Sequence, residues 1–280
     1  MNKFFIVLFK FYLIFISCTN LVAKPIIKGE IDFKSISPLI IEQELDSVNI
    51  RKYKEINKLF LSEDFSGSLK GALSLLNEIK NKDRELEYLC NYLIGEIFRK
   101  RNDHQRALEY FKKSLILAEQ KVFFDETKLR RYNNLLNQDK SHANSLLRIG
   151  TEFFMLRERD SAKFYFKKIL QISSLSDFSN VKASAYSNLS GIYQGDKEYD
   201  LAKDFALKAI NLHKNNNNKL SESSALNNYA SIFLLEKNYT KAREVYSEAI
   251  DLIKNDLSAK AIKNKEDLYY NLAYVLYMQK

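Results

Sequence analysis

Apolar and small residues recur at helical spacing through most of the chain. Tyr186 is followed by Leu189 and Tyr193, at offsets of three and seven residues. After Gly195 and a short polar turn, a second set recurs at steps of four and three residues: Ala202, Ala206 and Ala209. Each set of offsets places its members on one face of a helix. The pattern predicts two helices joined by a turn, the first with a large apolar face and the second with a small-residue face.

The same pair of faces recurs along the sequence. Units begin near residues 88, 143, 183, 223 and 266. The first helix of each unit carries one small residue beside a large one, and these are Gly95, Gly150, Ser190, Ala230 and Ala273. The second helix carries a matching alanine, at Ala107, Ala162, Ala202 and Ala242. Small residues on facing helices allow close packing, so each unit is expected to fold as a helical hairpin whose aromatic residues fill the space between neighbouring hairpins.

This arrangement resembles the tetratricopeptide repeat, in which a large residue, a leucine beside a small residue and an aromatic precede an Ala–aromatic–Ala helix. The resemblance covers residues 88–280 and implies an all-α fold, a right-handed superhelical solenoid of antiparallel helix pairs. It also implies a protein that binds another protein or a peptide and is not an enzyme. The unit spacings of 55, 40, 40 and 43 residues exceed the family's 34. Longer helices or connections, such as the polar run 214–218, must absorb the excess.

Three parts of the chain depart from the repeat pattern. Residues 43–87 show helical periodicity without the alanine signature and are expected to form a degenerate N-terminal hairpin. Residues 120–140 enlarge the first spacing and are expected to hold an extended helix and an extra short helix. The last unit stops after its first helix. Either the chain is a fragment of a longer protein, or this helix packs on a partner or on the preceding hairpin.

The resemblance also implies a ligand-binding groove lined by the first helix of each hairpin. An asparagine just before the leucine–small pair can point into that groove, and Asn188, Asn228 and Asn271 hold this place in three units. An amide carries both a donor and an acceptor, so it can pair with a peptide group of any sequence. Arg148 holds the same place one unit earlier and could pair with a carboxylate. One turn further on, three residues should share the face: Thr151, Ser231 and Tyr274. The competing interpretation is an ordinary row of solvated side chains.

The N-terminus has the features of a targeting segment. In residues 1–23 a lysine precedes an apolar run and a small-residue exit, which predicts export and cleavage after Ala23. Two alternatives remain. The segment Phe15-Ile16-Ser17-Cys18 resembles a bacterial lipoprotein signal, which would make Cys18 a lipid attachment site, and an uncleaved segment could anchor the chain in a membrane. Residues 24–42 are expected to be a linker, with no regular element beyond a short helix near its end. The expected location is the periplasm or cell envelope of a bacterium.

Composition narrows the classes of function. No proline occurs after Pro38, which favours helix after helix. The net charge is +9, but the basic runs are short and mixed with acids, so nucleic-acid binding is not expected. The sequence contains no phosphate-binding loop, nucleophile elbow or metal-ligand spacing, so no cofactor, metal or catalytic residue is predicted. Cys90, among apolar neighbours, is expected to be a small buried residue.

Three functions therefore remain in competition. The first is a scaffold or adaptor of the cell envelope that binds a protein or peptide in the groove. The second is the sensory N-terminal part of a bacterial regulator that continues into a DNA-binding or histidine-kinase part. The third, which depends on Cys18, is a lipoprotein of an envelope assembly complex.

Overall fold

A computed structural model describes residues 38–120, 138–172 and 179–279, and side chains within 48–120, 141–172 and 179–279. Every regular element in this part of the chain is a helix. The eleven helices are α2 (Pro38–Leu61), α3 (Phe65–Ile79), α4 (Arg84–Lys100), α5 (His104–Glu119), α7 (Gln138–Met155), α8 (Arg159–Gln171), α9 (Ser179–Gly195), α10 (Tyr199–Asn215), α11 (Lys219–Leu235), α12 (Tyr239–Ile253) and α13 (Ala259–Met278).

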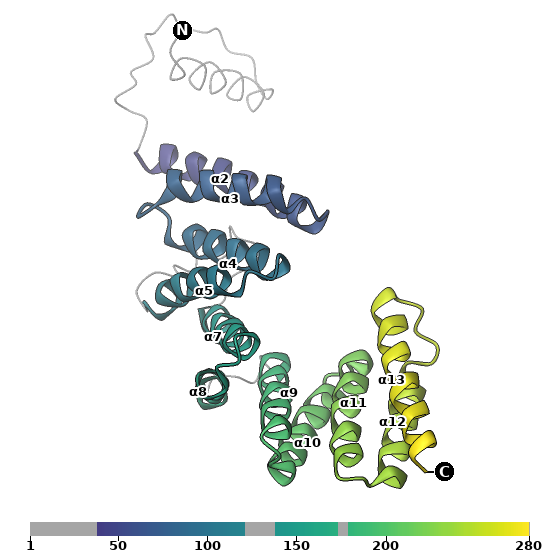
Figure 1. Ribbon diagram of the computed structural model, residues 1–280. Helices are drawn as coiled ribbons and strands as arrows, with labels where there is room; N and C mark the ends of the chain where they lie inside the picture. The colour runs from purple at the N-terminus through teal and green to yellow at the C-terminus, as the bar shows by residue number, and fades with distance from the viewer. Residues whose placement is uncertain (1–37, 121–137, 173–178, 280) are drawn as a thin grey trace, which may run out of the picture. The chain divides into compact units, whose positions relative to one another are not determined.

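Consecutive helices pair into antiparallel hairpins. Helix α4 packs on α5, α7 on α8, α9 on α10, and α11 on α12, with three residues between the two helices of each pair (Figure 1). Successive hairpins are also in contact, through α5 with α7, α8 with α9 and α10 with α11. Helix α13 packs on α12 as the first helix of a further unit would. The prediction of an all-α solenoid of antiparallel helix pairs is therefore confirmed.

The turns within hairpins share one backbone geometry, which explains their constant length. After α4, α7, α9 and α11 the middle turn residue has a positive φ: 59° at Asn102, 66° at Arg157, 64° at Lys197 and 61° at Lys237. In each turn the next backbone N–H bonds back to a carbonyl five residues earlier, as Asn238 does to Phe233 at 2.8 Å. This is the helix C-cap with one left-handed residue, which usually selects glycine. Here none of the four positions is glycine.

Several helix starts are capped by short polar side chains, whereas α8 and α10 have no side-chain cap bond. Asp83 accepts a hydrogen bond from the backbone N–H of Leu86 at 2.9 Å, and Asn238 accepts one from Lys241 at 3.2 Å. A cap of this kind satisfies one of the backbone donors left open in the first helical turn. The sequence therefore ends one helix and begins the next within a few residues, which keeps the turn between the two helices short.

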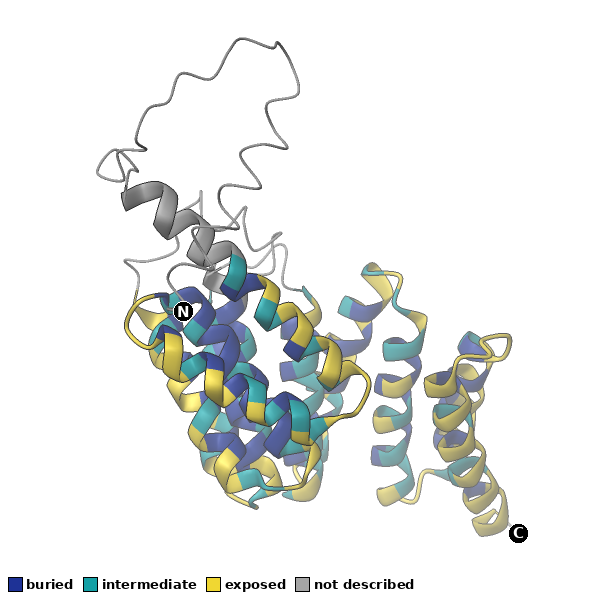
Figure 2. Ribbon diagram, turned by 90° about the horizontal axis from the view of Figure 1, so that it is seen from above, coloured by how far each residue is buried: buried dark blue, intermediate teal, exposed yellow. Residues whose placement is uncertain are grey.

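The core lies between the two helices of each hairpin and between hairpins, as the buried helix faces in Figure 2 show. Gly95 and Gly150 each face an aromatic ring of the partner helix. A Cβ at Gly95 would lie 2.7 Å from the ring of Phe111, and one at Gly150 would lie 2.7 Å from that of Phe166. Both rings are fully buried. These two aromatic residues therefore fill space within their own hairpin and not only between neighbouring hairpins.

Buried serines of two first helices bond to the partner helix of their hairpin. The hydroxyl of Ser190 donates to the carbonyl of Ala202 at 2.8 Å, and that of Ser223 donates to the carbonyl of Ala249 at 2.8 Å. Both serines are buried. A buried hydroxyl without a partner is costly, and both hydroxyls have one. At Ser190 the bond explains how serine takes the place that glycine or alanine holds in the other units.

A repeated ion pair joins successive hairpins. Lys163 of α8 lies 2.6 Å from Asp196, in the turn after α9, and Lys203 of α10 lies 3.0 Å from Glu236, in the turn after α11. The hydrogen bond from Lys163 lowers the pKa of Asp196. The two pairs have the same position in the repeat. The two lysines are 40 residues apart (163 to 203), and so are the two acids (196 to 236).

Several boundaries differ from the sequence-based expectation. Helix α2 begins at Pro38, near the end of the segment 24–42, where the sequence allowed a short helix, and it runs on to Leu61; proline suits a first helical position. Helix α10 extends to Asn215, so most of the polar run 214–218 forms a tight turn instead of a long loop. The first helices begin at residues 84, 138, 179, 219 and 259, ahead of the residues from which the units were counted. The segment 1–23, Cys18 and residues 121–137 lie outside the described residues.

Helix α13 exposes a face that is covered in the other first helices. Ala230 of α11 is fully buried, whereas Ala273, at the corresponding place in α13, is exposed. Three tyrosines and a leucine of α13 are also exposed, namely Tyr269, Tyr270, Tyr277 and Leu276. In the complete hairpins the second helix covers this face. No helix in the described part of the chain is both long enough and apolar enough to cross a membrane.

Candidate peptide-binding face

The residues predicted to line the groove lie on the first helices of three hairpins and on α13. Arg148 and Thr151 are on α7, Asn188 is on α9, Asn228 and Ser231 are on α11, and Asn271 and Tyr274 are on α13. Asn228 and Tyr274 are exposed, and the other five are half-buried. All seven side chains are therefore at least partly accessible to solvent.

Arg148 is already paired within the protein. Its Nε lies 2.5 Å from Oε1 of Glu96 and donates to the hydroxyl of Tyr92 at 3.1 Å. The other carboxylate oxygen of Glu96 accepts from Arg99 at 2.6 Å. These contacts join α7 to α4 across the boundary between two hairpins. A ligand carboxylate would therefore have to share Arg148 with Glu96.

A second buried acid lies beside this cluster. The side chain of Glu152 is fully buried, and its Oε2 lies 2.7 Å from Nδ1 of His104. Burial raises the pKa of Glu152, and the hydrogen bond with His104 opposes that rise. The other carboxylate oxygen, Oε1, is buried without a hydrogen bond. The Glu152–His104 pair thus joins α7 to α5 and adds to the polar contacts between these two hairpins.

The asparagines predicted to form a ladder have three different environments. The side-chain amide of Asn188 donates to the carbonyl of Ser184 in its own helix at 2.9 Å. That of Asn271 donates across to Oδ1 of Asn227 at 3.0 Å. The side chain of Asn228 is exposed to solvent and has no hydrogen bond to another described residue. Only Asn228 therefore presents its whole amide to solvent.

Polar side chains that the sequence pattern did not single out complete the row. Gln194 of α9 donates to the hydroxyl of Ser231 at 2.8 Å, and that hydroxyl donates to the carbonyl of Asn228 at 2.7 Å. Asn264 of α13 donates to the hydroxyl of Ser224 at 3.0 Å. Together with the Asn271–Asn227 bond, these contacts link α9, α11 and α13 side by side. Helix periodicity alone could not find the Gln194–Ser231, Asn264–Ser224 and Asn271–Asn227 bonds, because each of them joins residues on different helices.

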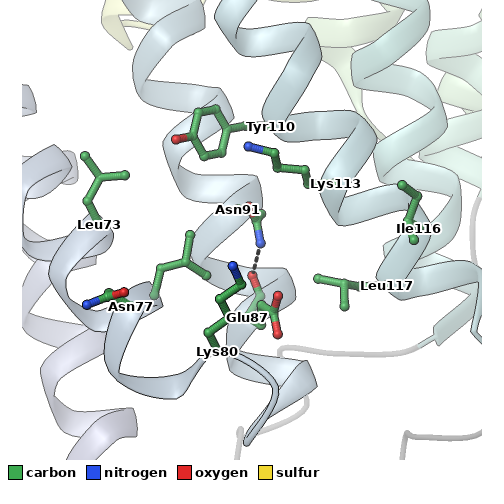
Figure 3. A pocket seen from close by; sticks show the side chains of 10 residues that line it. Leu73, Asn77, Lys80, Glu87, Asn91, Tyr110, Lys113, Ile116 and Leu117 are labelled. Atoms are coloured by element: carbon green, nitrogen blue, oxygen red, sulfur yellow. Dashed lines mark hydrogen bonds between the residues drawn. The ribbon is translucent and has the colours of Figure 1, made fainter.

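The predicted row does not form a closed pocket. Three hollows in the described residues, one of them drawn in Figure 3, are lined by second helices, by turns, by one side of α4 and by Lys219 at the start of α11. None of the seven predicted residues lines any of them. Thr151 donates its hydroxyl to the carbonyl of Leu147 within α7. Within the described residues, no three His, Cys, Asp or Glu side chains come together as metal ligands would. The row is thus an open, polar surface, suited to an extended ligand.

Family models for the tetratricopeptide repeat match residues 89–121 and residues 181–255. The matched segments cover the α4–α5 hairpin and the two hairpins from α9 to α12. No curated protein matches the chain.

Solved structures with the same fold share little sequence with the chain. The apo form of RapI aligns with a TM-score of 0.62 at 12% identity, covering 81% of this chain and 83% of RapI. Kinesin light chain-like repeats from Podosopora anserina align with a TM-score of 0.57 at 9% identity, and the alignment covers 78% of this chain and 98% of the chain of repeats. BtubC from P. vanneervenii aligns with a TM-score of 0.55 at 13% identity, and the alignment covers 80% of this chain and 91% of BtubC.

These matches and the stacked hairpins support a tetratricopeptide-repeat protein, and the fold is a tetratricopeptide-repeat solenoid. Folds of this class generally serve as non-catalytic scaffolds for protein interactions. The fold therefore suggests that the chain acts by binding a protein or peptide partner.

Proposed function

We propose that the chain is a non-enzymatic scaffold or adaptor that binds an extended peptide segment across the first helices α9, α11 and α13. The observation that supports this most is the polar row on these helices. The exposed amide of Asn228 stands between two cross-helix bonds, Gln194–Ser231 on one side and Asn271–Asn227 on the other.

Helix spacing and peptide geometry agree with this proposal. Packed helices lie roughly 8–10 Å apart. A peptide in the polyproline II conformation rises about 3.1 Å per residue and repeats every three residues, so it presents the same face roughly every 9 Å. Such a peptide would bring one backbone amide to each first helix that it crosses. Amide side chains at these crossings can pair with the peptide backbone and leave its side chains to set specificity.

A single substitution on α11 tests this proposal. Asn228→Ala removes the exposed amide without breaking a bond to a described residue, whereas Asn271→Ala would also break the bond to Asn227. Asn211→Ala is the matched control, since Asn211 is also exposed but lies on the second helix α10. Affinity capture from envelope extracts, quantified by mass spectrometry, should lose a partner with Asn228→Ala and keep it with Asn211→Ala. Equal capture by both variants would leave the row without a binding role.

We also propose that the protein acts in the bacterial cell envelope, and the basis is the sequence of residues 1–23. The mass of the N-terminal peptide of the protein isolated from cells distinguishes the three routes. Cleavage after Ala23 leaves Lys24 as the first residue, lipidation leaves an acylated Cys18, and a retained anchor leaves the whole segment. An intact, unmodified N-terminus on protein from the cytoplasmic fraction would overturn the proposal of export.

A further inference from the structure

Helix α13 exposes an apolar face that no helix of the described residues covers. Tyr269 and Ala273 correspond to Leu226 and Ala230 of α11, which lie 43 residues earlier (226 to 269 and 230 to 273). Leu226 is 4% exposed and Ala230 is 0% exposed, because α12 packs on this side of α11. By contrast, Tyr269 is 55% exposed and Ala273 is exposed as well. The open face of α13 is therefore the surface that takes a second helix in the complete hairpins.

The same face also has the features of a covering helix. In three hairpins the covering helix carries an alanine and, four residues later, a fully buried aromatic residue, and these pairs are Ala107 and Phe111, Ala162 and Phe166, and Ala242 and Tyr246. Ala273 and Tyr277 have this spacing on α13, and Tyr269 lies four residues before Ala273. A small residue with aromatics equally far on both sides makes the face complementary to itself.

Two-fold symmetry would pair two such faces in the manner of a hairpin. A two-fold axis that crosses α13 at Ala273 places the helices of two copies antiparallel, as the two helices of each hairpin are. Residues equally far from Ala273 then meet, so Tyr269 of each copy lies against Tyr277 of the other. Residues 268–279 carry no charged side chain. Two copies can therefore approach at this face although the chain has a net charge of +9.

The ion pairs that join successive hairpins leave one cation open beside this face. Lys203 pairs with Glu236, and the corresponding places in the next unit hold Arg243 (203 to 243) and Gln279 (236 to 279). Arg243 is exposed and forms no ion pair with another described residue. In the antiparallel arrangement Glu266, seven residues before the axis, lies level with the end of α13 in the other copy. Glu266 is also exposed and has no ion pair with a described residue, so it can supply the missing acid.

We propose that α13 binds the α13 of a second copy of this chain, antiparallel and centred at Ala273, with Arg243 of each copy paired to Glu266 of the other. Tyr270 and Tyr277 are 75% and 72% exposed. Since a fully buried tyrosine covers about 150–250 Å², the tyrosines and Leu276 offer roughly 500 Å² in each copy. An interface of about 1,000 Å² is at the lower end for specific pairs, so the dissociation constant should be on the order of 10 µM. The dilute chain is therefore a monomer in which Ala273 stays exposed.

The pairing leaves the first-helix row open. This row is the polar surface of α9, α11 and α13 that includes Asn228 and the Gln194–Ser231 and Asn271–Asn227 bonds. Asn271 is two residues from Ala273 and so lies on the opposite side of α13. The Asn228→Ala variant should therefore pair with a second copy as the unmodified chain does. Loss of the pairing would likewise not imply loss of partner capture by the row.

Disulfide trapping tests the pairing at its axis, where position 273 meets the same position of the other copy. The variant Ala273→Cys is made in the full chain together with Cys18→Ser, which leaves the buried Cys90 as the other cysteine. Mild oxidation at a chain concentration of about 100 µM, roughly tenfold above the expected dissociation constant, should give a disulfide-linked dimer. Leu207→Cys, at an exposed apolar residue of α10, is the control and should stay monomeric. No dimer from Ala273→Cys, or equal dimer from both variants, would overturn the proposal.

Charge reversal tests the ion pair between copies, with sedimentation velocity as the measurement. Arg243→Glu alone and Glu266→Arg alone should each weaken dimerisation about tenfold, because either dimer then holds two like-charged contacts. An equimolar mixture of the two variants should dimerise like the unmodified chain, since both contacts again join opposite charges. Lys167→Glu, at an exposed residue of α8, should leave dimerisation unchanged.

Recovery in the mixture is specific to pairing between two copies, because contacts within one chain would stay broken in each variant. An unmodified chain that remains monomeric at about 100 µM would overturn the proposal and leave the face of α13 to a helix of other origin. A mixture that dimerises no better than either variant alone would overturn it as well.

Discussion

At the scale of single residues, the glycines of the first helices test how tightly each hairpin is packed. Gly95→Ala should lower the free energy of unfolding by about 1–3 kcal/mol, because the new Cβ would lie 2.7 Å from the buried ring of Phe111. Gly191 offers a matched control on α9, since a Cβ there would meet nothing within 4 Å. Gly191→Ala should raise the free energy of unfolding by roughly 0.5–1 kcal/mol through helix propensity. Urea denaturation measures both, and a stabilising Gly95→Ala would contradict the packing.

The buried acid Glu152 should make stability depend on pH. Burial raises its pKa in the folded protein above the ordinary value. Between those two pKa values the folded state holds the proton more firmly than the unfolded state does. The free energy of unfolding therefore falls as pH rises through this window. Glu152→Gln should remove that fall, so the variant should gain stability relative to the unmodified chain at pH 7 more than at pH 4.

Thermal unfolding followed from pH 4 to pH 7 measures this effect. Glu109→Gln serves as the control because Glu109 is an exposed residue of α5. The control should reproduce the pH profile of the unmodified chain. A Glu152→Gln profile parallel to the control would show that burial does not perturb this carboxyl.

At the scale of helices and turns, the left-handed turn residues offer a route to stabilisation. Lys237, between α11 and α12, has a φ of 61°, which costs an ordinary residue about 1–2 kcal/mol. Lys237→Gly should therefore raise the free energy of unfolding by about 1 kcal/mol, after the greater flexibility of glycine in the unfolded chain is allowed for. Asn102→Gly should gain less, because asparagine tolerates this conformation. Chemical denaturation of the two variants checks the order, and a larger gain at Asn102 would contradict it.

The two alanines at corresponding places in α11 and α13 should respond differently to enlargement. Ala230 is fully buried against its hairpin, so Ala230→Leu should cost about 1–3 kcal/mol through overpacking. Ala273 is exposed, so Ala273→Leu should change stability by less than about 0.5 kcal/mol. Equal costs measured by denaturation would mean that another element covers α13 in solution.

The hairpins themselves could be predicted because each is encoded locally. Small residues such as Gly95 and Ala202 recur at helical spacing, and helix periodicity together with short polar turns is enough to pair neighbouring helices. The turn geometry was less accessible, since lysine and arginine occupy positions at Lys197 and Arg157 where glycine is the usual signal.

At the scale of the whole molecule, the candidate site was harder to predict because its contacts join different hairpins. The pairing of Arg148 with Glu96 links residues 52 positions apart (148 minus 96), and the Asn271–Asn227 bond links residues 44 apart. Such contacts depend on how successive hairpins stack, which periodicity within one hairpin does not encode.

The central claim is that a partner binds along the first helices, and site-specific photo-cross-linking tests it most directly. A benzoylphenylalanine placed at position 228 of the full chain in living cells lies on the exposed face of α11, and one at position 211 lies on α10. Irradiation should produce a covalent adduct with a partner protein from position 228 and none from position 211. The same adduct from both positions, or an adduct from position 211 alone, would contradict binding along the first-helix row.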